Sequence, residues 1–395
     1  MNLFFKRLSG KLVKTEKFEK MMRSLLADAK HYREVEQSDS YKEFEELHAL
    51  VSSDKFQAKK QDLTSRKYKD TEYFSKLKEL KQLSKDKDVK KYLKAKSEAD
   101  RSAVAGTIAV KSYLRLKEET ETADFKEQNA FWADGKRWEH SENGQKEARY
   151  QVLKNSAEIR FHAKANKRRI EELESWKQTF DTTFHEPSLA KNGFKAGFWF
   201  KQPQLKREYS YCEEAQAYMG EQNVNIQNDV LSIVTKKEHV SAPAWDGKCG
   251  FIMHDFNYTS AIINTGETFG QSIGMFTAKV RATGKCHSAI YLVGENRFPL
   301  IELYHYNGRN IVVGVTDKHG KTEEVLRGIS ASDWYVMTVG VNRQEIIWKI
   351  NEMEVFRCVN PLPGQKLYIS CQSFAPADKA GEGRLDIAWI RAYER

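Results

Sequence analysis

The uneven distribution of proline and glycine constrains the fold of this 395-residue chain most. All seven prolines lie at or after Pro187, and only four of the 22 glycines precede it. Proline removes a helix donor and glycine adds backbone freedom, so a segment poor in both favours helix. The sequence therefore predicts a helical first half and a turn-rich second half, with a boundary near residues 186–196.

The first half is rich in Lys, Glu, Leu, Ala and Gln, which lose little side-chain freedom in a helix. Four aspartates recur at a nearly constant spacing, and each is followed by an aromatic residue or valine: Asp39, Asp54, Asp70 and Asp86. An acidic residue at a helix start compensates the free N–H groups there. We expect a repeat of short helices over residues 1–102 that stack on their neighbours. The alternative is a chance period in a segment rich in Lys and Asp.

Residues 103–186 are expected to form longer helices. Residues 147–184 combine charged and apolar positions over about ten turns, which predicts one long helix with a single apolar seam, as in a coiled coil. We expect this helical half to self-associate or to bind a partner protein. The basic cluster 167–169 lacks any recognised nucleic-acid fold, so nucleic acid is an unlikely partner. Residues 187–204 are expected to be a linker that enters the second domain.

Charge and apolar runs bear on partners and location. The net charge is +10, and most of this excess lies in the helical half. No apolar run approaches the ~18 residues of a membrane-spanning helix. The apolar run at residues 3–5 is too short for a secretory signal peptide, which predicts a protein of the cytoplasm, or of a virion or other particle. The five cysteines form no CxxC pair, so free thiols are expected, not a disulfide framework or zinc site.

From residue 205 the apolar pattern changes to a period of two. Short runs of β-branched and aromatic residues, such as 286–294 and 345–351, are separated by turns such as 306–308. About a dozen such strands indicate a β-sandwich. The predicted fold is therefore an α+β multidomain chain, with an all-α helical repeat or bundle followed by a sandwich over residues 205–395.

Four segments of the second half carry a resemblance to a known family. They are YTSAIINTGETFGQSIGMFTAKVRA (258–282), HSAIYLVGENRFPLIELYHYNG (287–308), DWYVMTVGVNRQEIIWKINEMEVFR (333–357) and RLDIAWIRAYER (384–395). In order and pattern they resemble family 16 of the glycoside hydrolases, the laminarinase and agarase type. The resemblance implies a concanavalin A-like jelly roll with a polysaccharide cleft. It does not extend to the helical half.

The resemblance also implies that catalytic groups of the family are missing here. The family takes its three acids from one strand, and those positions fall on Leu300, Glu302 and His305 here. Retaining hydrolysis needs two carboxyl groups ~5–5.5 Å apart, and leucine cannot act as a nucleophile. The sequence therefore predicts a sandwich without the paired mechanism. Hydrolysis would need a second carboxylate from elsewhere, such as Glu295 or Asp255.

A sugar-binding cleft could remain without catalysis. With a period of two, Tyr304 and Tyr306 share the strand face of Glu302, and Tyr291 stands where the family often has a cleft tryptophan. Aromatic rings stack on sugars, and Glu or His can hydrogen-bond hydroxyl groups. Arg297 could pair with Glu302 or with an acidic sugar. The predicted ligand-binding residues are Tyr291, Arg297, Glu302, Tyr304, His305 and Tyr306.

Asp386 matches a position where many family members hold a structural calcium ion. Calcium would need further oxygen ligands, and the alternative is a surface aspartate. No other cofactor is expected.

Together these features predict a non-catalytic, lectin-like module that binds an oligo- or polysaccharide. The helical half would serve as a tether or oligomerisation arm and raise avidity through effective concentration. A structural or assembly protein that uses the sandwich to bind protein is one alternative, and a divergent glycoside hydrolase is the other.

Overall fold

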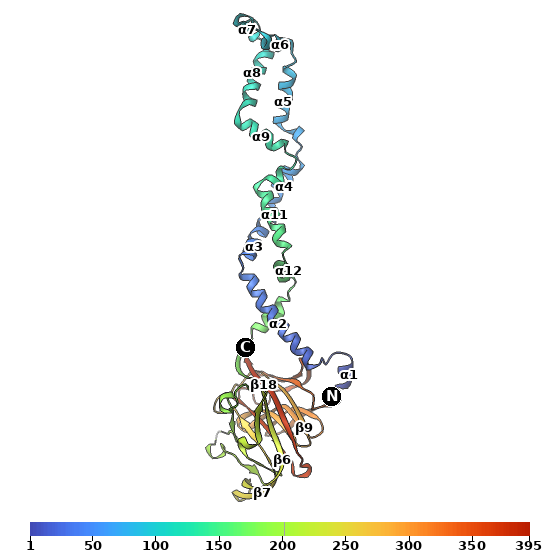
Figure 1. The fold of residues 1–395 in the computed structure, drawn as a ribbon, viewed down its shortest axis with the longest axis vertical. Coiled ribbons are helices and arrows are strands. Elements are labelled where there is room, and N and C mark those ends of the chain that lie inside the picture. Colours follow the sequence, from blue (N-terminus) through green and yellow to red (C-terminus); the bar gives the residue numbers. More distant parts are fainter. Residues whose placement is uncertain (201) are drawn as a thin grey trace. The chain divides into compact units, whose positions relative to one another are not determined.

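The computed structural model describes residues 1–200 and 202–395 (Figure 1). The chain divides into two compact units. The helical unit comprises residues 26–166, and the sandwich unit comprises residues 1–25 together with 167–395. The helical unit is thus inserted into the sequence of the sandwich unit. Among the described residues, no helix has the length and apolar character needed to cross a bilayer.

The helical unit is a hairpin of short helices. Helices contact one another across the hairpin, α3 with α11, α4 with α10, and α5 with α8 (Figure 1). It contains the second part of α2 (Thr15–Gln37), then α3 (Asp39–Val51), α4 (Asp54–Ser65), η1 (Tyr68–Asp70), α5 (Glu72–Leu83), α6 (Lys87–Lys94), α7 (Glu98–Ala105), α8 (Ile108–Glu121), α9 (Ala123–Ala133), α10 (Arg137–His140), α11 (Glu142–Lys154) and α12 (Ala157–Lys164).

Ser, Thr and Asp caps divide this unit into its short helices. Each cap side chain accepts a hydrogen bond from the backbone N–H three residues later, at Ser38, Ser53, Thr71, Asp86, Ser97, Thr107, Thr122, Ser141 and Ser156. Of the four predicted aspartate caps, only Asp86 has this role. Asp39 and Asp54 follow their caps and Asp70 precedes one, because a neighbouring hydroxyl accepts the bond instead.

The repeat in the helical half is longer than the predicted one, which follows the spacing of the four aspartates. Elements α3, α4, η1, α5, α6 and α7 match α8, α9, α10, α11, α12 and α13 (Lys167–Glu174) in order and closely in length. The starts of matched elements keep an almost constant offset, as at positions 39 and 108 or 87 and 157. The turn sequence RKYKDTE (66–72) has its counterpart in KRWEHSE (136–142). The pairing of α3 with α11 also has its equivalent in that of α8 with α5, as a pseudo-twofold duplication requires.

The predicted helix over residues 147–184 does not form. Helix α11 ends at Lys154, Ser156 caps α12, and Ala165 is extended before α13. The helices after residue 103 are as a group no longer than those before it. Strand β1 (Lys177–Thr182) already belongs to the sandwich unit. Capping hydroxyls interrupt the apolar seam, so its period alone overestimates the helix length.

The described residues of the predicted linker 187–204 are also part of the sandwich unit. Leu189 and Phe194 are buried in the sandwich core together with Phe184. The segment contains η2 (Ala190–Asn192) and β2 (Lys195–Ala196), and β2 pairs with β8.

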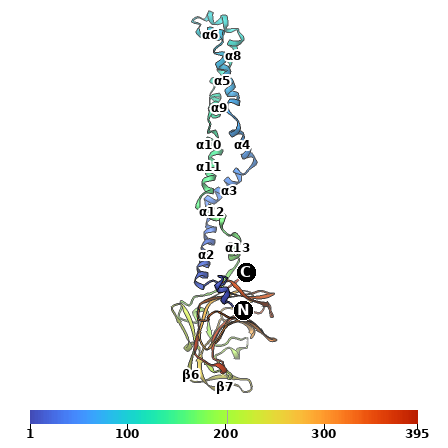
Figure 2. The same ribbon diagram turned by 90° about the vertical axis from the view of Figure 1, so that its right-hand side faces the viewer.

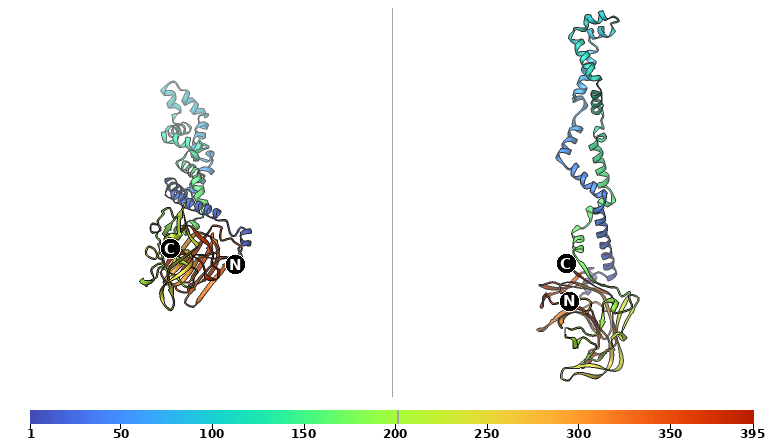
Figure 3. Two further views of the ribbon diagram at one scale, coloured as in Figure 1. Left: turned by 60° about the horizontal axis from the view of Figure 1, so that its bottom comes forward. Right: turned by 90° about the vertical axis from the view of Figure 1, so that its left-hand side faces the viewer.

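Two mainly antiparallel sheets form the sandwich (Figure 2, Figure 3). The smaller has the order β13-β12-β11-β10-β17-β8-β2, and the larger follows β16-β15-β14-β9-β18-β6-β7-β4, with β1, β3 and β5 attached. The remaining bounds are α1 (Phe4–Leu8), η3 (Pro203–Leu205), β3 (Ser210–Tyr211), β4 (Gln216–Tyr218), η4 (Gly220–Asn223), β5 (Val224–Gln227), β6 (Val230–Asp246), β7 (Gly250–Ser260), β8 (Ile262–Asn264), β9 (Gly274–Gly284), β10 (His287–Asn296), β11 (Phe298–Asn307), β12 (Ile311–Asp317), β13 (Gly320–Leu326), β14 (Tyr335–Val341), β15 (Glu345–Ile350), β16 (Met353–Val359), β17 (Leu367–Phe374), η5 (Ala377–Lys379) and β18 (Gly383–Glu394).

One apolar core lies between the two sheets. Trp348 and Phe276 of the larger sheet and Ile290 and Leu303 of the smaller sheet are fully or almost fully buried in it. Leu3 also belongs to this core, although it precedes the helical unit in sequence. The predicted helical half and jelly-roll sandwich are therefore confirmed. All five cysteines are free thiols, and Cys286 and Cys371 are among the buried side chains, whereas Cys249 is exposed.

Candidate functional site

The candidate site lies on the outer face of β11, the face opposite the sandwich core. Ile290 of β10 pairs with Tyr304 and Tyr291 pairs with Glu302, so Leu303 is the extra residue of a β-bulge. Consequently Leu303 and Tyr304 both point into the core. The bulge returns His305 to the outer face beside Glu302, with which it is hydrogen-bonded.

Glu302 is the central group of this face and is almost completely buried, with 3% of its surface exposed. Its Oε1 lies 2.8 Å from His305 Nδ1 and 2.9 Å from Lys321 Nζ of β13. Its Oε2 is buried without a hydrogen-bond partner among the described residues. Burial alone would raise the pKa of this carboxyl, but His305 and Lys321 outweigh burial and hold it below its usual value. Glu302 is thus a charged carboxylate whose Oε1 is held in place by His305 and Lys321.

A second contact fixes the backbone at Glu302. The Trp348 indole Nε1 donates a hydrogen bond of 2.8 Å to the Glu302 carbonyl oxygen. Trp348 lies on β15 of the opposite sheet and is fully buried. The bulge is therefore held from the core side as well as from the outer face.

His305 also belongs to an aromatic group at one end of this face. Its Nε2 lies 3.4 Å from His287 Nδ1, and Phe374 lies against both rings at 5.0 and 6.0 Å between ring centres. Burial lowers the pKa of His287 to about 4, and the neighbouring His305 adds to this effect. His287 is therefore neutral near pH 7, and its ring can offer a hydrogen-bond acceptor.

The chain itself covers much of this face. Trp199 packs against Tyr368 of β17, and the Tyr368 hydroxyl donates a hydrogen bond to the Trp199 carbonyl oxygen. The side chain of Gln216 accepts a bond of 2.7 Å from the backbone N–H of Ala375. Tyr291 faces this side as predicted, but it is buried, with 7% of its surface exposed. Trp199 and the segment around Gln216 thus form a cover over part of the sheet face.

Glu214 is a further carboxyl group in this covering segment. Its Oε2 accepts hydrogen bonds from the backbone N–H of Tyr211 and from Gln216 Nε2 at 3.3 and 2.9 Å. Burial raises its pKa to about 7. It therefore keeps its proton up to a higher pH than an exposed glutamate does.

Three predicted ligand-binding residues lie elsewhere. Tyr304 is fully buried in the sandwich core, and Tyr306 packs against that core and donates its hydroxyl to the Gly284 carbonyl oxygen. The prediction that they share the face of Glu302 is wrong, because the bulge changes the phase of the strand. Arg297 is exposed in the hairpin between β10 and β11, where its guanidinium lies 5.8 Å from the Phe298 ring. Lys321 takes the predicted place of Arg297 beside Glu302.

The proposed sources of a second carboxylate do not reach Glu302. Glu295 is four residues beyond Tyr291 on β10, about 13 Å along the strand. Asp255 is exposed on β7 of the other sheet, opposite Ser241. Leu300 lies on the outer side with the apolar residues of the covered face. Of Leu300, Glu302 and His305 on β11, only Glu302 therefore carries a carboxylate.

The sequence predicts Asp386 as a calcium ligand or, alternatively, as a surface aspartate. The surface alternative is wrong, because Asp386 is buried. Its Oδ1 accepts a bond of 2.7 Å from Ser232, and its Oδ2 lies 2.9 Å from Arg281 Nε and 3.2 Å from Arg384 Nε. Two guanidinium groups occupy the space that calcium would share with further oxygens, so these residues do not fit a calcium site. The described residues include no group of three or more His, Cys, Asp or Glu side chains placed to hold a metal ion.

Sequence reasoning missed Lys321, His287 and Glu214. Each reaches the site from another strand or loop, and nothing in its local sequence marks it. A lysine near the start of a predicted strand gives no sign of the carboxylate that it meets across β12. Strand order, which the sequence does not reveal directly, decides these contacts.

No protein-family model and no curated protein matches this chain. Solved structures are similar to its C-terminal part. The laminarinase catalytic domain from Thermotoga maritima is 16% identical, with a TM-score of 0.44 over 56% of this chain and 98% of that one. The endo-β-1,3-glucanase from Pyrococcus furiosus is 16% identical (TM-score 0.45; 55% and 94%), and the κ-carrageenase from Pseudoalteromonas carrageenovora is 14% identical (0.42; 55% and 94%). The helical half is not matched.

Proposed function

We propose that this chain is a non-catalytic recognition protein whose sandwich binds an oligo- or polysaccharide without cleaving it. The observation that carries the proposal is the outer face of β11, where Leu300 and His305 flank a single carboxylate. Paired-carboxylate hydrolysis needs a nucleophile and a separate acid at glycosidic-bond spacing. Glu302 is already engaged by Lys321 and His305, which leaves it poorly placed to attack an anomeric carbon.

Binding would use the partly exposed groups at the edge of the covered face. Trp199 and Phe374 are half-buried, and Lys321 keeps about a third of its side chain exposed beside Glu302. An aromatic face together with charged and imidazole hydrogen-bonding groups suits a sugar ring, which has an apolar face and polar hydroxyl edges. The helical unit would then act as a tether or as a partner-binding arm.

The test combines a glycan array with an assay for newly formed reducing ends, using the full chain on β-glucans and sulfated galactans. We expect saturable binding without turnover. Trp199→Ala should weaken binding up to about tenfold, because it removes one stacking ring. Trp389→Ala, a half-buried tryptophan of β18 in the other sheet, is the matched control and should leave binding unchanged.

Reducing ends that disappear in Glu302→Gln or in Glu214→Gln would overturn the non-catalytic proposal. These two variants test the carboxyl group of β11 and the one in the segment that covers the sheet face. Absence of glycan binding in the intact chain would overturn the carbohydrate part and favour the second candidate.

The second candidate is a structural or assembly protein, located in the cytoplasm, a virion or another particle. The specific observation in its favour is the cover over the outer face of the smaller sheet, where Tyr291 of the sheet and Tyr218 of the covering segment are both buried. A sheet face that is covered by a segment of the same chain stabilises the fold, but it leaves little room for a ligand to bind and leave. This candidate predicts concentration-dependent self-association in light scattering, with no glycan bound. A monomer at all concentrations that binds glycan would contradict it.

A further inference from the structure

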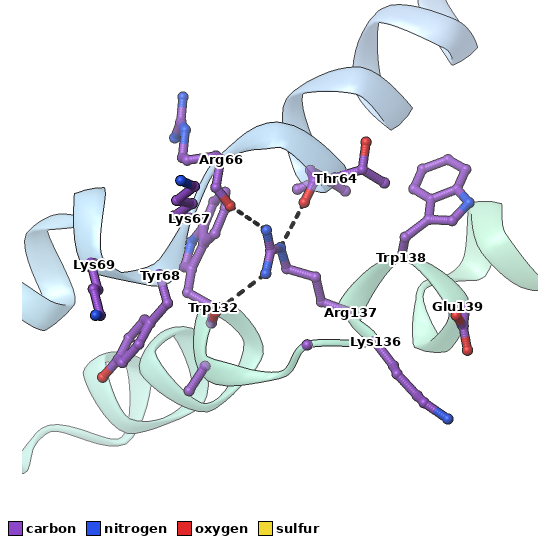
Figure 4. A pocket seen from close by; sticks show the side chains of 13 residues that line it. Thr64, Arg66, Lys67, Tyr68, Lys69, Trp132, Lys136, Arg137, Trp138 and Glu139 are labelled. Atoms are coloured by element: carbon purple, nitrogen blue, oxygen red, sulfur yellow. Dashed lines mark hydrogen bonds between the residues drawn. The ribbon is translucent and has the colours of Figure 1, made fainter.

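Two cavities of this chain are each lined by an arginine with a different role. The cavity of about 680 Å³ in the helical unit is lined by Arg137, which is buried (Figure 4). Its Nε donates to the Leu63 carbonyl oxygen at 2.7 Å, and its terminal nitrogens donate to the carbonyl oxygens of Asp134 and Arg66. All three nitrogens are therefore engaged at the C-terminal ends of α4 and α9, where carbonyl groups lack helix partners. Arg137 is a structural cap.

The second cavity, of about 350 Å³, lies in the sandwich unit. It is lined by residues 12–16 of the N-terminal segment, by residues 332–335 at the start of β14, and by Arg7 and Arg281. Its volume is within the range of small-molecule sites, ~300–1,000 Å³. Because β9 and β14 belong to the larger sheet, this cavity is separate from the candidate site on β11.

Arg281 of β9 keeps two of its three nitrogens free of hydrogen bonds. Its Nε donates to Asp386 at 2.9 Å, and within the described part of the chain neither terminal nitrogen has a hydrogen-bond partner. Its guanidinium carbon lies 4.6 Å from the centre of the Trp334 ring, and about a third of the side chain is exposed. Asp386 and Trp334 thus hold the guanidinium in place, while its terminal nitrogens can still donate to a ligand.

Asp386 cannot neutralise both of its cationic partners. It is buried, and it pairs with Arg281 at 2.9 Å and with Arg384 at 3.2 Å. Neither arginine has another carboxylate at ion-pair distance among the described residues. One positive charge is therefore uncompensated. Of the two guanidinium groups, that of Arg281 lines the cavity and that of Arg384 does not.

The other charged residues that line the cavity balance one another. Arg7 pairs with Asp333 at 3.2 Å. Lys14 and Glu16 are both exposed and contribute opposite charges. Glu16 also lies in the first turn of α2, where the helix dipole favours a negative charge. The excess positive charge at this cavity therefore belongs to Arg281.

The cavity walls are fixed by hydrogen bonds and are partly apolar. The Thr15 hydroxyl donates to the Trp334 carbonyl oxygen, and Asn351 donates to the Val13 carbonyl oxygen at 2.9 Å. Leu12 is buried in the sandwich core, and Val13 and Trp334 are half-buried. A site that is already formed lowers the entropic cost of binding. Apolar surface therefore lies beside a guanidinium that can still donate.

We propose that this cavity binds one small organic monocarboxylate, whose carboxylate meets the terminal nitrogens of Arg281 and whose apolar body contacts Trp334 and Val13. The edge of a guanidinium matches the two oxygens of a carboxylate, and such charge-assisted hydrogen bonds are the strong kind. A single carboxylate also neutralises the one excess charge. This site goes beyond the proposed sugar-binding function and does not depend on it.

The test is calorimetric titration of the full chain with two acids and their neutral counterparts, benzoate with benzamide and glucuronate with glucose. We expect saturable binding of at least one acid, and its neutral counterpart should bind at least about tenfold more weakly because it lacks the charge. The tighter acid shows whether the apolar body is an aromatic ring or a sugar. Equal binding of an acid and its counterpart would overturn the site, and so would absence of saturable binding by both acids.

Arg281→Gln should weaken the binding of that acid at least about tenfold. The matched control is Arg384→Gln, which removes the other guanidinium from Asp386, lowers the net charge equally and should retain the affinity. An equal loss in both variants would overturn the site.

A second variant, Val13→Phe, narrows the cavity without changing the contacts of Asp386. It should also weaken binding, and it decides the question if Arg281→Gln does not fold. Unchanged affinity in a folded Val13→Phe chain would overturn the site. Circular dichroism and thermal unfolding of all three variants check that the chain remains folded.

Discussion

Tyr304 combines complete burial with an unsatisfied polar group. Its ring lies in the sandwich core, and among the described residues its hydroxyl has no hydrogen-bond partner. A buried hydroxyl without a partner costs about 1–3 kcal/mol. We therefore expect Tyr304→Phe to leave the free energy of unfolding unchanged or to raise it by about 1 kcal/mol, as measured by urea denaturation.

The comparison for Tyr304 is Trp348→Phe, which removes the indole donor to the Glu302 carbonyl oxygen and some core volume. That change should lower the free energy of unfolding by about 2–4 kcal/mol. A clear destabilisation by Tyr304→Phe would show that its hydroxyl has a partner, such as a buried water.

His287 and Glu214 give stability opposite dependences on pH. The pKa of His287 is lowered to about 4, so the unfolded chain binds more protons between pH 4 and 6.5, and stability falls as pH falls. The pKa of Glu214 is raised to about 7, so the native chain binds more protons between pH 4.5 and 7, and stability falls as pH rises. The two slopes oppose each other in the overlap.

Single variants should separate these slopes in urea midpoints measured between pH 4.5 and 7. In Glu214→Gln only the His287 effect remains, so the free energy of unfolding should rise with pH. In His287→Gln only the Glu214 effect remains, so the free energy of unfolding should fall by about 2–3 kcal/mol as pH rises. The rise from His287 should be smaller, about 1–2 kcal/mol, because this ring is partly exposed and solvent screens it. Parallel pH curves for the two variants would contradict this assignment.

The residues of the candidate site show how far strand periodicity can be used. That Leu300 and His305 replace catalytic acids stays a prediction from the resemblance. Strand periodicity is consistent with Tyr291, which the structure places on the face of Glu302. It fails for Tyr304 and Tyr306, since one bulged residue reverses the facing of all that follow it. A bulge has no reliable local signal, because Leu303 suits either phase.

At the scale of elements, the duplicated caps allow a direct comparison. Ser53 begins α4 and Thr122 begins the equivalent α9, and each accepts the N–H of a phenylalanine three residues later. Ser53→Ala and Thr122→Ala should each lower stability by about 1 kcal/mol, measured by thermal or urea unfolding of the helical signal. Ser53→Asp keeps a side-chain oxygen that can accept this hydrogen bond, so it should retain most of the stability and serves as the control.

A loss in one variant only would contradict the equivalence of the two repeats at this position. The two positions are expected to respond alike because the turns after α4 and α9 are also equivalent. The duplication is thus testable by energetics as well as by geometry.

The elements also show why helix content is easier to predict than helix length. Composition correctly indicates helix through most of residues 1–176. The breaks depend on hydroxyl caps followed by a buried apolar residue three positions later, as at Ser156 and Ile159. The four aspartates near such sites suggest the pattern, but the capping group is in most cases the adjacent Ser or Thr.

At the scale of the molecule, composition and core membership divide the chain differently. The change in proline and glycine content near residue 187 marks where backbone freedom increases. The compact units instead separate at residues 25 and 166, because Leu3 and Leu12 are buried in the sandwich core. Long-range contacts determine this boundary, and a local sequence pattern does not contain them.

The N-terminal segment should therefore behave as part of the sandwich. Asn351 donates to the Val13 carbonyl oxygen at 2.9 Å, and Lys279 pairs with Glu19 at 2.9 Å. Replacing residues 26–166 by a flexible Gly/Ser linker should leave a sandwich that unfolds cooperatively. Leu3→Ala and Leu12→Ala in that shortened chain should each cost about 2–5 kcal/mol, as measured by urea denaturation with tryptophan fluorescence.

The exposed Leu8 of α1 provides the matched control, since Leu8→Ala removes the same atoms from a side chain that lies in solvent. It should change stability by less than about 0.5 kcal/mol. If all three leucine variants behave alike, residues 1–25 do not belong to the sandwich core. If the shortened chain fails to fold while the intact chain is stable, the helical unit contributes to the sandwich, and the two units are not independent.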